Sequence, residues 1–214
     1  AGAVLIAVTA GAQEKLQFNY IMHAEPEGVF WNIVLLGMND ACRDLNVDCL
    51  MIGAGGGGDN PRQLANFQAS VAAGVDGIVT TIPDDNMFDA AVQDALDAGI
   101  PVISANVDDS EGRDGNPRLS FVGSGLWQTA YDVAEALTAH FPEGDVHLLL
   151  GHSDVTQGFA IQRAAGIEAA LEDYKAANPD RKITWEVVEV SNDGAKVTTR
   201  VGAYLQAVPE TNAY

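Results

Sequence analysis

The stretch from Gly74 to Asp84, GVDGIVTTIPD, decides the fold. Its centre, Gly77–Thr81, is a short apolar run rich in β-branched residues, which predicts a buried strand. Gly74 stands just past a helical pattern, where a helix ends in a left-handed residue. A proline follows the strand, and Asp84 or the aspartate after it is expected to cap the next helix. Helix, glycine, buried strand and capped helix together form the repeating unit of a parallel α/β sheet.

Outward from this stretch, the same alternation of short apolar runs and longer helical patterns continues. It predicts strands at Leu16–Met22, Cys49–Ile52, Gly77–Thr81, Pro101–Ala105, Leu119–Val122, Asp145–Leu150 and Ile183–Val190. Helices are predicted at Val29–Leu45, 60–73, 84–98, Leu126–His140, Phe159–Ala176 and Ala195–Ala207. The helix at 60–73 is expected to have Asn60 as its N-cap and a proline in its first turn. The fold class is therefore α/β, with two Rossmann-like doubly wound parallel-sheet lobes.

Three segments are predicted along the chain. Residues 1–12, AGAVLIAVTAGA, are uncharged and end in a small-x-small pattern, so we expect the remnant of a secretory signal peptide, with a first β-strand as the alternative. Residues 13–124 form an N-terminal α/β lobe and 125–214 part of a C-terminal α/β lobe, with the boundary at the glycine-rich strand end Phe121–Gly125. No strand is predicted after the last helix, so we expect the second lobe to be incomplete in this sequence.

Acidic residues dominate the charge of the chain. Its 214 residues include 30 Asp and Glu against 11 Lys and Arg, for a formal net charge of -19. Such a surface repels phosphate backbones and anionic lipids, which excludes nucleic acid as a partner. The apolar run at the N-terminus is too short to span a bilayer, so no membrane insertion is expected in the mature form.

The chain contains two cysteines, Cys42 and Cys49, on either side of a predicted helix end and strand start. In an oxidising compartment they would form a disulfide that closes a very short loop. Two reduced, partly buried thiols are the alternative. A metal site is excluded because no second Cys or His pair stands nearby.

Two motifs raise the question of an enzyme. Gly53–Gly58 satisfies GxGxxG, but it follows the second strand and the next helix starts only after the last glycine, so a Rossmann enzyme with a nucleotide cofactor is a minor alternative. His152, Ser153 and Asp154 are neighbours in sequence, whereas a catalytic triad needs side chains that converge from separate elements. We therefore predict a protein that is not an enzyme and needs no cofactor.

Polar and aromatic side chains gather at the carboxyl ends of the predicted strands and at the helix starts that follow. Open α/β sheets bind small molecules at this edge. Aromatic faces pack on the apolar faces of a sugar ring, while carboxylates, amides and guanidinium groups bind its hydroxyls. The residues predicted to bind a sugar-like ligand are His23, Phe30, Trp31, Asp84, Asn106, Ser124, Asp154 and Arg163.

Several of these positions lie in segments that resemble the ribose-binding branch of the periplasmic binding proteins, the type I substrate-binding components of ABC sugar importers. The matching segments are Gly28–Trp31 with Gly37, Gly74–Asp84, Ala98–Ile103 with Asn106, Phe121–Gly123 and Arg163–Gly166.

The resemblance implies a periplasmic protein that closes two lobes around a small-molecule sugar and hands it to the permease subunits of an ABC transporter. It implies that Phe30 and Trp31 stack on the sugar ring and that Asn106 and Arg163 bind its hydroxyls. Val107 departs from the Arg that ribose-binding members carry there, so ribose itself is not implied. The ligand-sensing domain of a sugar-responsive regulator or chemoreceptor system shares this fold and remains the alternative.

Overall fold

The structure, a computed structural model, describes residues 14–55, 58–153, 157–191 and 193–213. The predicted signal remnant at 1–12 and the candidate residue Asp154 lie outside the described residues. Helices and strands alternate along the chain as β1 Gln17–Met22, α1 Val29–Leu45, β2 Asp48–Gly53, α2 Asn60–Ala73, β3 Gly77–Thr80, α3 Asp89–Asp97, β4 Val102–Ala105, β5 Ser120–Val122, α4 Leu126–Thr138, β6 Val146–His152, α5 Gly158–Ala177, β7 Ile183–Glu189 and α6 Gly194–Ala207.

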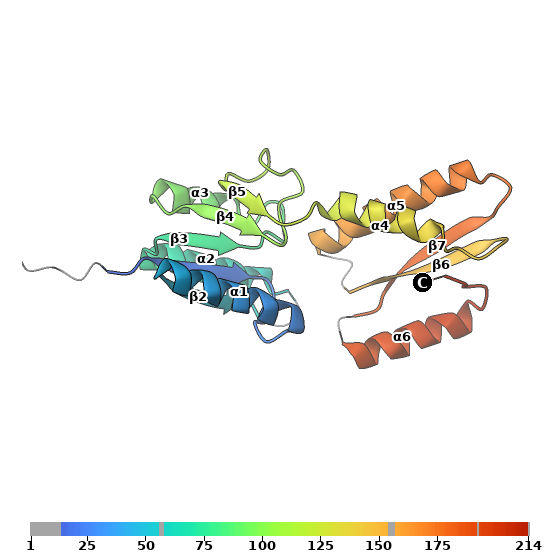
Figure 1. The fold of residues 1–214 in the computed structure, drawn as a ribbon, viewed down its shortest axis with the longest axis horizontal. Coiled ribbons are helices and arrows are strands. Elements are labelled where there is room, and N and C mark those ends of the chain that lie inside the picture. Colours follow the sequence, from blue (N-terminus) through green and yellow to red (C-terminus); the bar gives the residue numbers. More distant parts are fainter. Residues whose placement is uncertain (1–13, 56–57, 154–156, 192, 214) are drawn as a thin grey trace, which may run out of the picture.

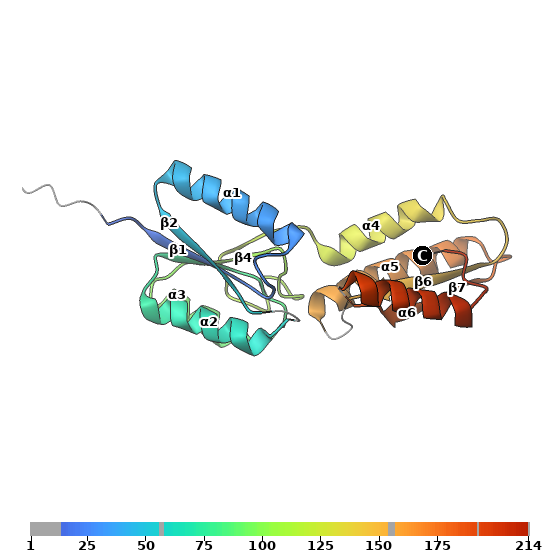
Figure 2. The same ribbon diagram turned by 90° about the horizontal axis from the view of Figure 1, so that it is seen from below.

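The first lobe contains β1 to β5 and α1 to α3. Its five strands lie in the order β2-β1-β3-β4-β5, and every neighbouring pair is parallel. In Figure 2, α1 covers one face of this sheet and α2 and α3 cover the other. The predicted α/β fold with helices on both faces of a parallel sheet is therefore confirmed.

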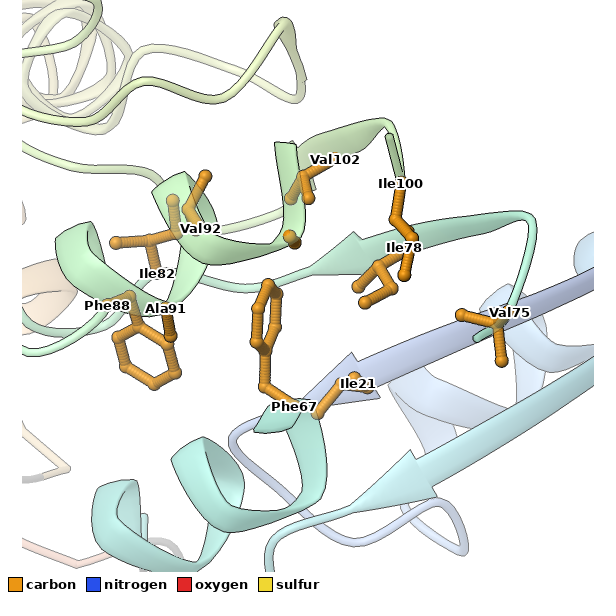
Figure 3. Packing of buried hydrophobic residues seen from close by; sticks show 11 residues of the cluster. Ile21, Phe67, Val75, Ile78, Ile82, Phe88, Ala91, Val92, Ile100 and Val102 are labelled. Atoms are coloured by element: carbon orange, nitrogen blue, oxygen red, sulfur yellow. The ribbon is translucent and has the colours of Figure 1, made fainter. Parts of the chain in front are cut away.

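Buried side chains alternate along β1 to serve the two faces. Tyr20 and Met22 pack with Trp31 beneath α1. Ile21, between them in sequence, belongs to the larger cluster with Phe67 and Phe88 beneath α2 and α3 (Figure 3). A fully buried side chain of this size contributes roughly 1.5–3 kcal/mol to folding. This cluster fixes the positions of β1 and β3, whose carboxyl ends carry the site described below.

The second lobe contains the parallel pair β6 and β7 with α4, α5 and α6. Figures 1 and 2 place α4 and α5 on one side of the pair and α6 on the other. Val146 and Leu148 pack with Leu171 of α5. His147, between them, points to α6, where its Nε2 lies 3.0 Å from the hydroxyl oxygen of Tyr204. An isolated parallel bridge joins Leu148 to residue 213.

Two predicted helix starts are wrong. The N-cap of α2 is Asp59 rather than Asn60, because the Asp59 carboxylate accepts a hydrogen bond from the Arg62 backbone N–H at 3.0 Å. The helix expected from Asp84 begins only at Asp89. Asp84 closes a separate turn, since its Oδ1 accepts hydrogen bonds from the backbone N–H groups of residues 86 and 87 at 3.0 and 2.9 Å. This turn buries Phe88 completely before α3 starts.

A disulfide joins Cys42, near the end of α1, to Cys49 at the start of β2, with their Cα atoms 6.2 Å apart. Closing so short a loop stabilises the fold by roughly 2.5 kcal/mol in the chain-entropy model. Between the two cysteines, Asn46 ends α1 in the left-handed conformation, with φ of 54°. The bond therefore fastens a sharp turn between the helix and the edge strand.

Candidate functional site

A polar cluster lies where β1 and β3 end side by side. His23 follows β1, and its backbone N–H donates to Thr81 Oγ1 at 3.1 Å. Gln63 Nε2 donates to the same oxygen at 2.9 Å. Because Thr81 Oγ1 accepts both of these protons, its own proton points to His23 Nδ1, 3.0 Å away. This arrangement holds His23 as the neutral tautomer that carries its proton on Nε2.

Electrostatics agree with a neutral imidazole. The pKa of His23 is lowered to about 4, mainly by burial and to a smaller extent by the positive charge of Arg163. Within the described part of the chain, no cluster of His, Cys, Asp or Glu has the composition of a metal site. His23 is thus available as a hydrogen-bond donor to a ligand across the whole physiological pH range.

Aromatic rings from both lobes surround His23. Its ring lies 5.6 Å from that of Trp31 and 5.4 Å from that of Phe159, measured between centroids. Phe30 makes an edge-to-face contact with Trp31 at 5.1 Å. Phe159 in turn contacts Arg163, whose guanidinium carbon lies 5.7 Å from the centroid of the Phe159 ring. We call Trp31, His23, Phe159 and Arg163 the junction stack.

The lobes also touch through backbone at this place. A Cβ atom added to Gly158, the first residue of α5, would lie 3.1 Å from the carbonyl oxygen of Pro83. Gln157, just before it, approaches Gly58 in the loop after β2. The start of α5 therefore rests against loops that follow the first lobe's strands, and the absence of a side chain at Gly158 permits this approach.

A cavity of about 660 Å³ opens in the second lobe between α4, β6 and α5. Most of its lining is apolar. Ser124, His152 and Arg163 also line it, and they stand before α4, at the end of β6 and in the second turn of α5. In Figure 1 the start of α4, the end of β6 and the start of α5 face the first lobe. Arg163 belongs both to this lining and to the junction stack, so the cavity and the stack meet at this residue.

Comparison with known proteins identifies the family to which this chain belongs. A family model described as a periplasmic binding protein domain matches residues 18–213. The chain belongs to this family. Among the described helices of this periplasmic binding protein, none combines the length and the hydropathy needed to cross a membrane.

One relative is the xylose/arabinose-binding protein XylF of Sulfolobus acidocaldarius, which is 30% identical over 173 residues. The alignment covers 70% of this chain and 42% of XylF, so the chain spans less than half the length of that relative.

Two solved structures are similar in fold. A periplasmic sugar-binding protein of an ABC sugar transporter from Legionella pneumophila superposes with a TM-score of 0.83 at 27% identity, over 92% of this chain and 69% of its own. A carbohydrate transporter protein from Acidothermus cellulolyticus, in complex with myo-inositol, superposes with a TM-score of 0.76 at 25% identity, over 93% and 64%.

The structure brings some of the predicted site residues of this periplasmic binding protein together. His23, Trp31 and Arg163 belong to the junction stack, and Ser124 lines the cavity with Arg163. Trp31 is 7% exposed and packs in the core beneath α1, whereas Phe30 is 55% exposed. The expectation that both rings stack on a sugar stays a prediction, and only Phe30 offers a large free surface.

Other predicted residues lie in different settings. The Asp84 carboxylate is occupied by the turn described above. Asn106 follows β4 in the left-handed conformation, with φ of 66°, and its backbone N–H donates to the Val122 carbonyl at 3.0 Å. The loop after it is clamped by Asp108, whose Oδ1 accepts a hydrogen bond from Arg118 Nε at 2.7 Å. With the Arg118 and Asp108 side chains 4% and 13% exposed, this ion pair is a structural element of the loop.

Sequence reasoning missed Thr81, Gln63, Phe159 and His152. The contacts of Thr81 and Gln63 with His23 depend on the order of strands in the sheet, which the chain order does not give. For Phe159 and His152 a signal was present: a His stands at or directly after the end of each lobe's first strand, with a Phe seven residues later.

Proposed function

We propose that this periplasmic binding protein captures a monosaccharide-like polyol between its two lobes, outside the cytoplasm, and presents it to the permease subunits of an ABC importer. The junction stack carries the proposal, because it assembles rings and donors from both lobes around one neutral histidine. The sugar-related names of XylF and of the Legionella and Acidothermus proteins support the same ligand class.

The chemistry of the stack suits a polyol. The C–H faces of a sugar ring pack on aromatic surface, which Phe30 and Phe159 offer from opposite lobes. Hydroxyl oxygens accept from the Nε2–H of His23 and from the guanidinium of Arg163, and the amide of Asn106 adds a donor and an acceptor. In a site that closure removes from water, an unmatched polar group costs about 1–3 kcal/mol, which makes the pattern of hydroxyls selective.

Binding in this proposal is coupled to closure. A ligand held by His23 and Phe30 gains its contacts with Phe159 and Arg163 only when the second lobe is close, so it shifts the population toward the closed form. That form is the one a transporter would recognise. No bond in the ligand is made or broken, so the protein acts as a carrier and not as an enzyme. Export through the N-terminal signal is part of the same proposal.

A thermal-shift panel tests the function. The chain is unfolded by heat in the presence of D-xylose, L-arabinose, D-ribose, D-glucose and myo-inositol. A ligand at a hundred times its dissociation constant stabilises the fold by about 2.7 kcal/mol, which corresponds to roughly 5–11 °C for a chain of this size. Arg163→Met should abolish the shift, while Arg200→Met, at an exposed ion pair of α6, should keep it. If no sugar raises the melting temperature, the proposal fails.

A further inference from the structure

Gln63 is a fully buried polar side chain on α2 that reaches the end of β3. Its Nε2 lies 2.7 Å from the Thr81 carbonyl oxygen and 2.9 Å from Thr81 Oγ1. A carbonyl oxygen only accepts, so the amide nitrogen and not the amide oxygen faces Thr81. A longer contact of 3.3 Å joins the same nitrogen to Thr80 Oγ1. The two protons of the amide are therefore both used at the end of β3.

The amide oxygen of Gln63 is in a different situation. Oε1 is buried and has no hydrogen-bond partner among the described residues. A buried acceptor without a partner opposes folding, and an apolar side chain of similar length would avoid this cost. A role in stabilising the lobe therefore does not account for a glutamine here, whereas the two hydrogen bonds that its nitrogen donates to Thr81 do.

The nitrogen of Gln63 decides the direction of the next hydrogen bond. The hydroxyl of Thr81 has two lone pairs and one proton. Gln63 Nε2 and the backbone N–H of His23 fill the lone pairs, at 2.9 and 3.1 Å. The hydroxyl proton is then left for His23 Nδ1, 3.0 Å away. Without Gln63 one lone pair would be open, and the hydroxyl could turn to accept a proton from Nδ1.

We propose that Gln63 is a positioning residue of the sugar site, which acts through Thr81 to keep His23 Nδ1 an acceptor and Nε2–H the donor that the ligand meets. The inference rests on the proposed function, in which His23 contacts the polyol, and it adds the polarity of that contact. The ligand atom that meets His23 must accept a hydrogen bond, as a hydroxyl or ring oxygen does. An ammonium group, which only donates, is rejected at this place.

The charge near His23 does not supply the same control. Trp31 of α1, Thr81 after β3 and Phe159 of α5 contact the imidazole and carry no charge. Among the described residues, the charge that acts on the imidazole is that of Arg163 in α5. A positive charge opposes protonation of either ring nitrogen, whereas the hydroxyl of Thr81 acts on Nδ1 alone.

Nitrogen NMR of the complete, isotope-labelled chain without sugar tests this control. Long-range proton–nitrogen spectra at neutral pH show which ring nitrogen of His23 carries the proton, and the wild type should carry it on Nε2. Gln63→Met keeps the length of the side chain and removes both donors, so part of the Nδ1 signal should move to the position of a protonated nitrogen. Gln93→Met, at an exposed glutamine of α3, should leave the spectrum of His23 unchanged.

A pH titration of the same samples gives the magnitude. In the wild type a proton on His23 Nδ1 would face the proton of the Thr81 hydroxyl. In Gln63→Met the hydroxyl can turn and accept from the protonated nitrogen. Because hydrogen bonds to charged groups are among the stronger ones, the midpoint of the His23 titration should rise by about one pH unit or more. Thr81→Val has no hydroxyl to accept this proton, so its midpoint should not rise.

Three results overturn the inference. They are a wild-type His23 protonated on Nδ1, a Gln63→Met chain that titrates like the wild type, and equal rises in Gln63→Met and Thr81→Val, which would indicate loosened packing. If Gln63→Met does not fold, the wild-type spectrum and a rise in Thr81→Val still decide against it. None of these measurements contains a sugar, so the proposed function fails separately, through a panel in which no sugar stabilises the chain.

Discussion

The neutral His23 makes a quantitative prediction about acid stability. Burial, and less strongly the charge of Arg163, lower its pKa from 6.5 in the unfolded chain to about 4 in the folded one. Between pH 4 and pH 6.5 the unfolded state binds a proton on His23 and the folded state does not. The stability present above pH 6.5 is therefore lost as the pH falls toward 4. At 1.36 kcal/mol per pKa unit, the loss between pH 7 and pH 4.5 is about 2.5 kcal/mol.

Paired unfolding curves isolate this contribution. Wild type and His23→Gln are unfolded by urea at pH 7, 6, 5 and 4.5, and the difference between their free energies of unfolding is plotted against pH. Contributions from the many carboxylates cancel in that difference, because both chains carry them. Wild type should lose its advantage over His23→Gln by about 2.5 kcal/mol toward pH 4.5. A flat difference would refute the neutral, buried histidine.

Two substitutions and the reduction of the disulfide test the scaffold. Gly53→Ala should destabilise the chain by about 1–3 kcal/mol in urea, because its Cβ would lie 2.5 Å from a carbonyl oxygen of the loop after β1; Gly194→Ala, with open space around it, serves as the neutral control. Arg118→Met should lower the free energy of unfolding by about 3–5 kcal/mol, because it leaves the Asp108 carboxylate without its cationic partner. Adding Asp108→Leu should recover most of that loss. Equal losses in the single and double variants would contradict the ion pair. Reducing the disulfide between α1 and β2 should lower the free energy of unfolding by roughly 2.5 kcal/mol, measured with and without a thiol reductant, and an unchanged urea midpoint would contradict its role.

Much of the fold could be predicted because the residues that start and end helices in the sequence also do so in the folded chain. The bounds of α1 were predicted in full, since a glycine precedes the helix and Asn46 ends it in the left-handed region. Asp84 shows where such signals become ambiguous. Its carboxylate accepts from the backbone N–H groups two and three residues later, as a helix N-cap also does, so the sequence does not distinguish a helix start from a separate turn.

The candidate site was harder, because its contacts join distant parts of the chain. Phe30 and Trp31 are adjacent aromatic residues at a helix start, and the sequence does not say which ring enters the core. They point about 100° apart on a helix, so the packing beneath α1 accepts one and leaves the other exposed. Phe159 is placed against His23 by the meeting of two lobes, for which local periodicity carries no information.

The hydrogen bond between His23 and Thr81 has a consequence for the order of folding. The two residues are 58 positions apart, with β2 and α2 between them in the chain, yet β1 and β3 are neighbours in the sheet. Contacts of such long sequence separation form only after a large loop has closed, so they arise late compared with helices and hairpins. A nascent chain therefore cannot hold His23 in place before β3 has docked beside β1, so this part of the candidate site forms only after 58 further residues have been made.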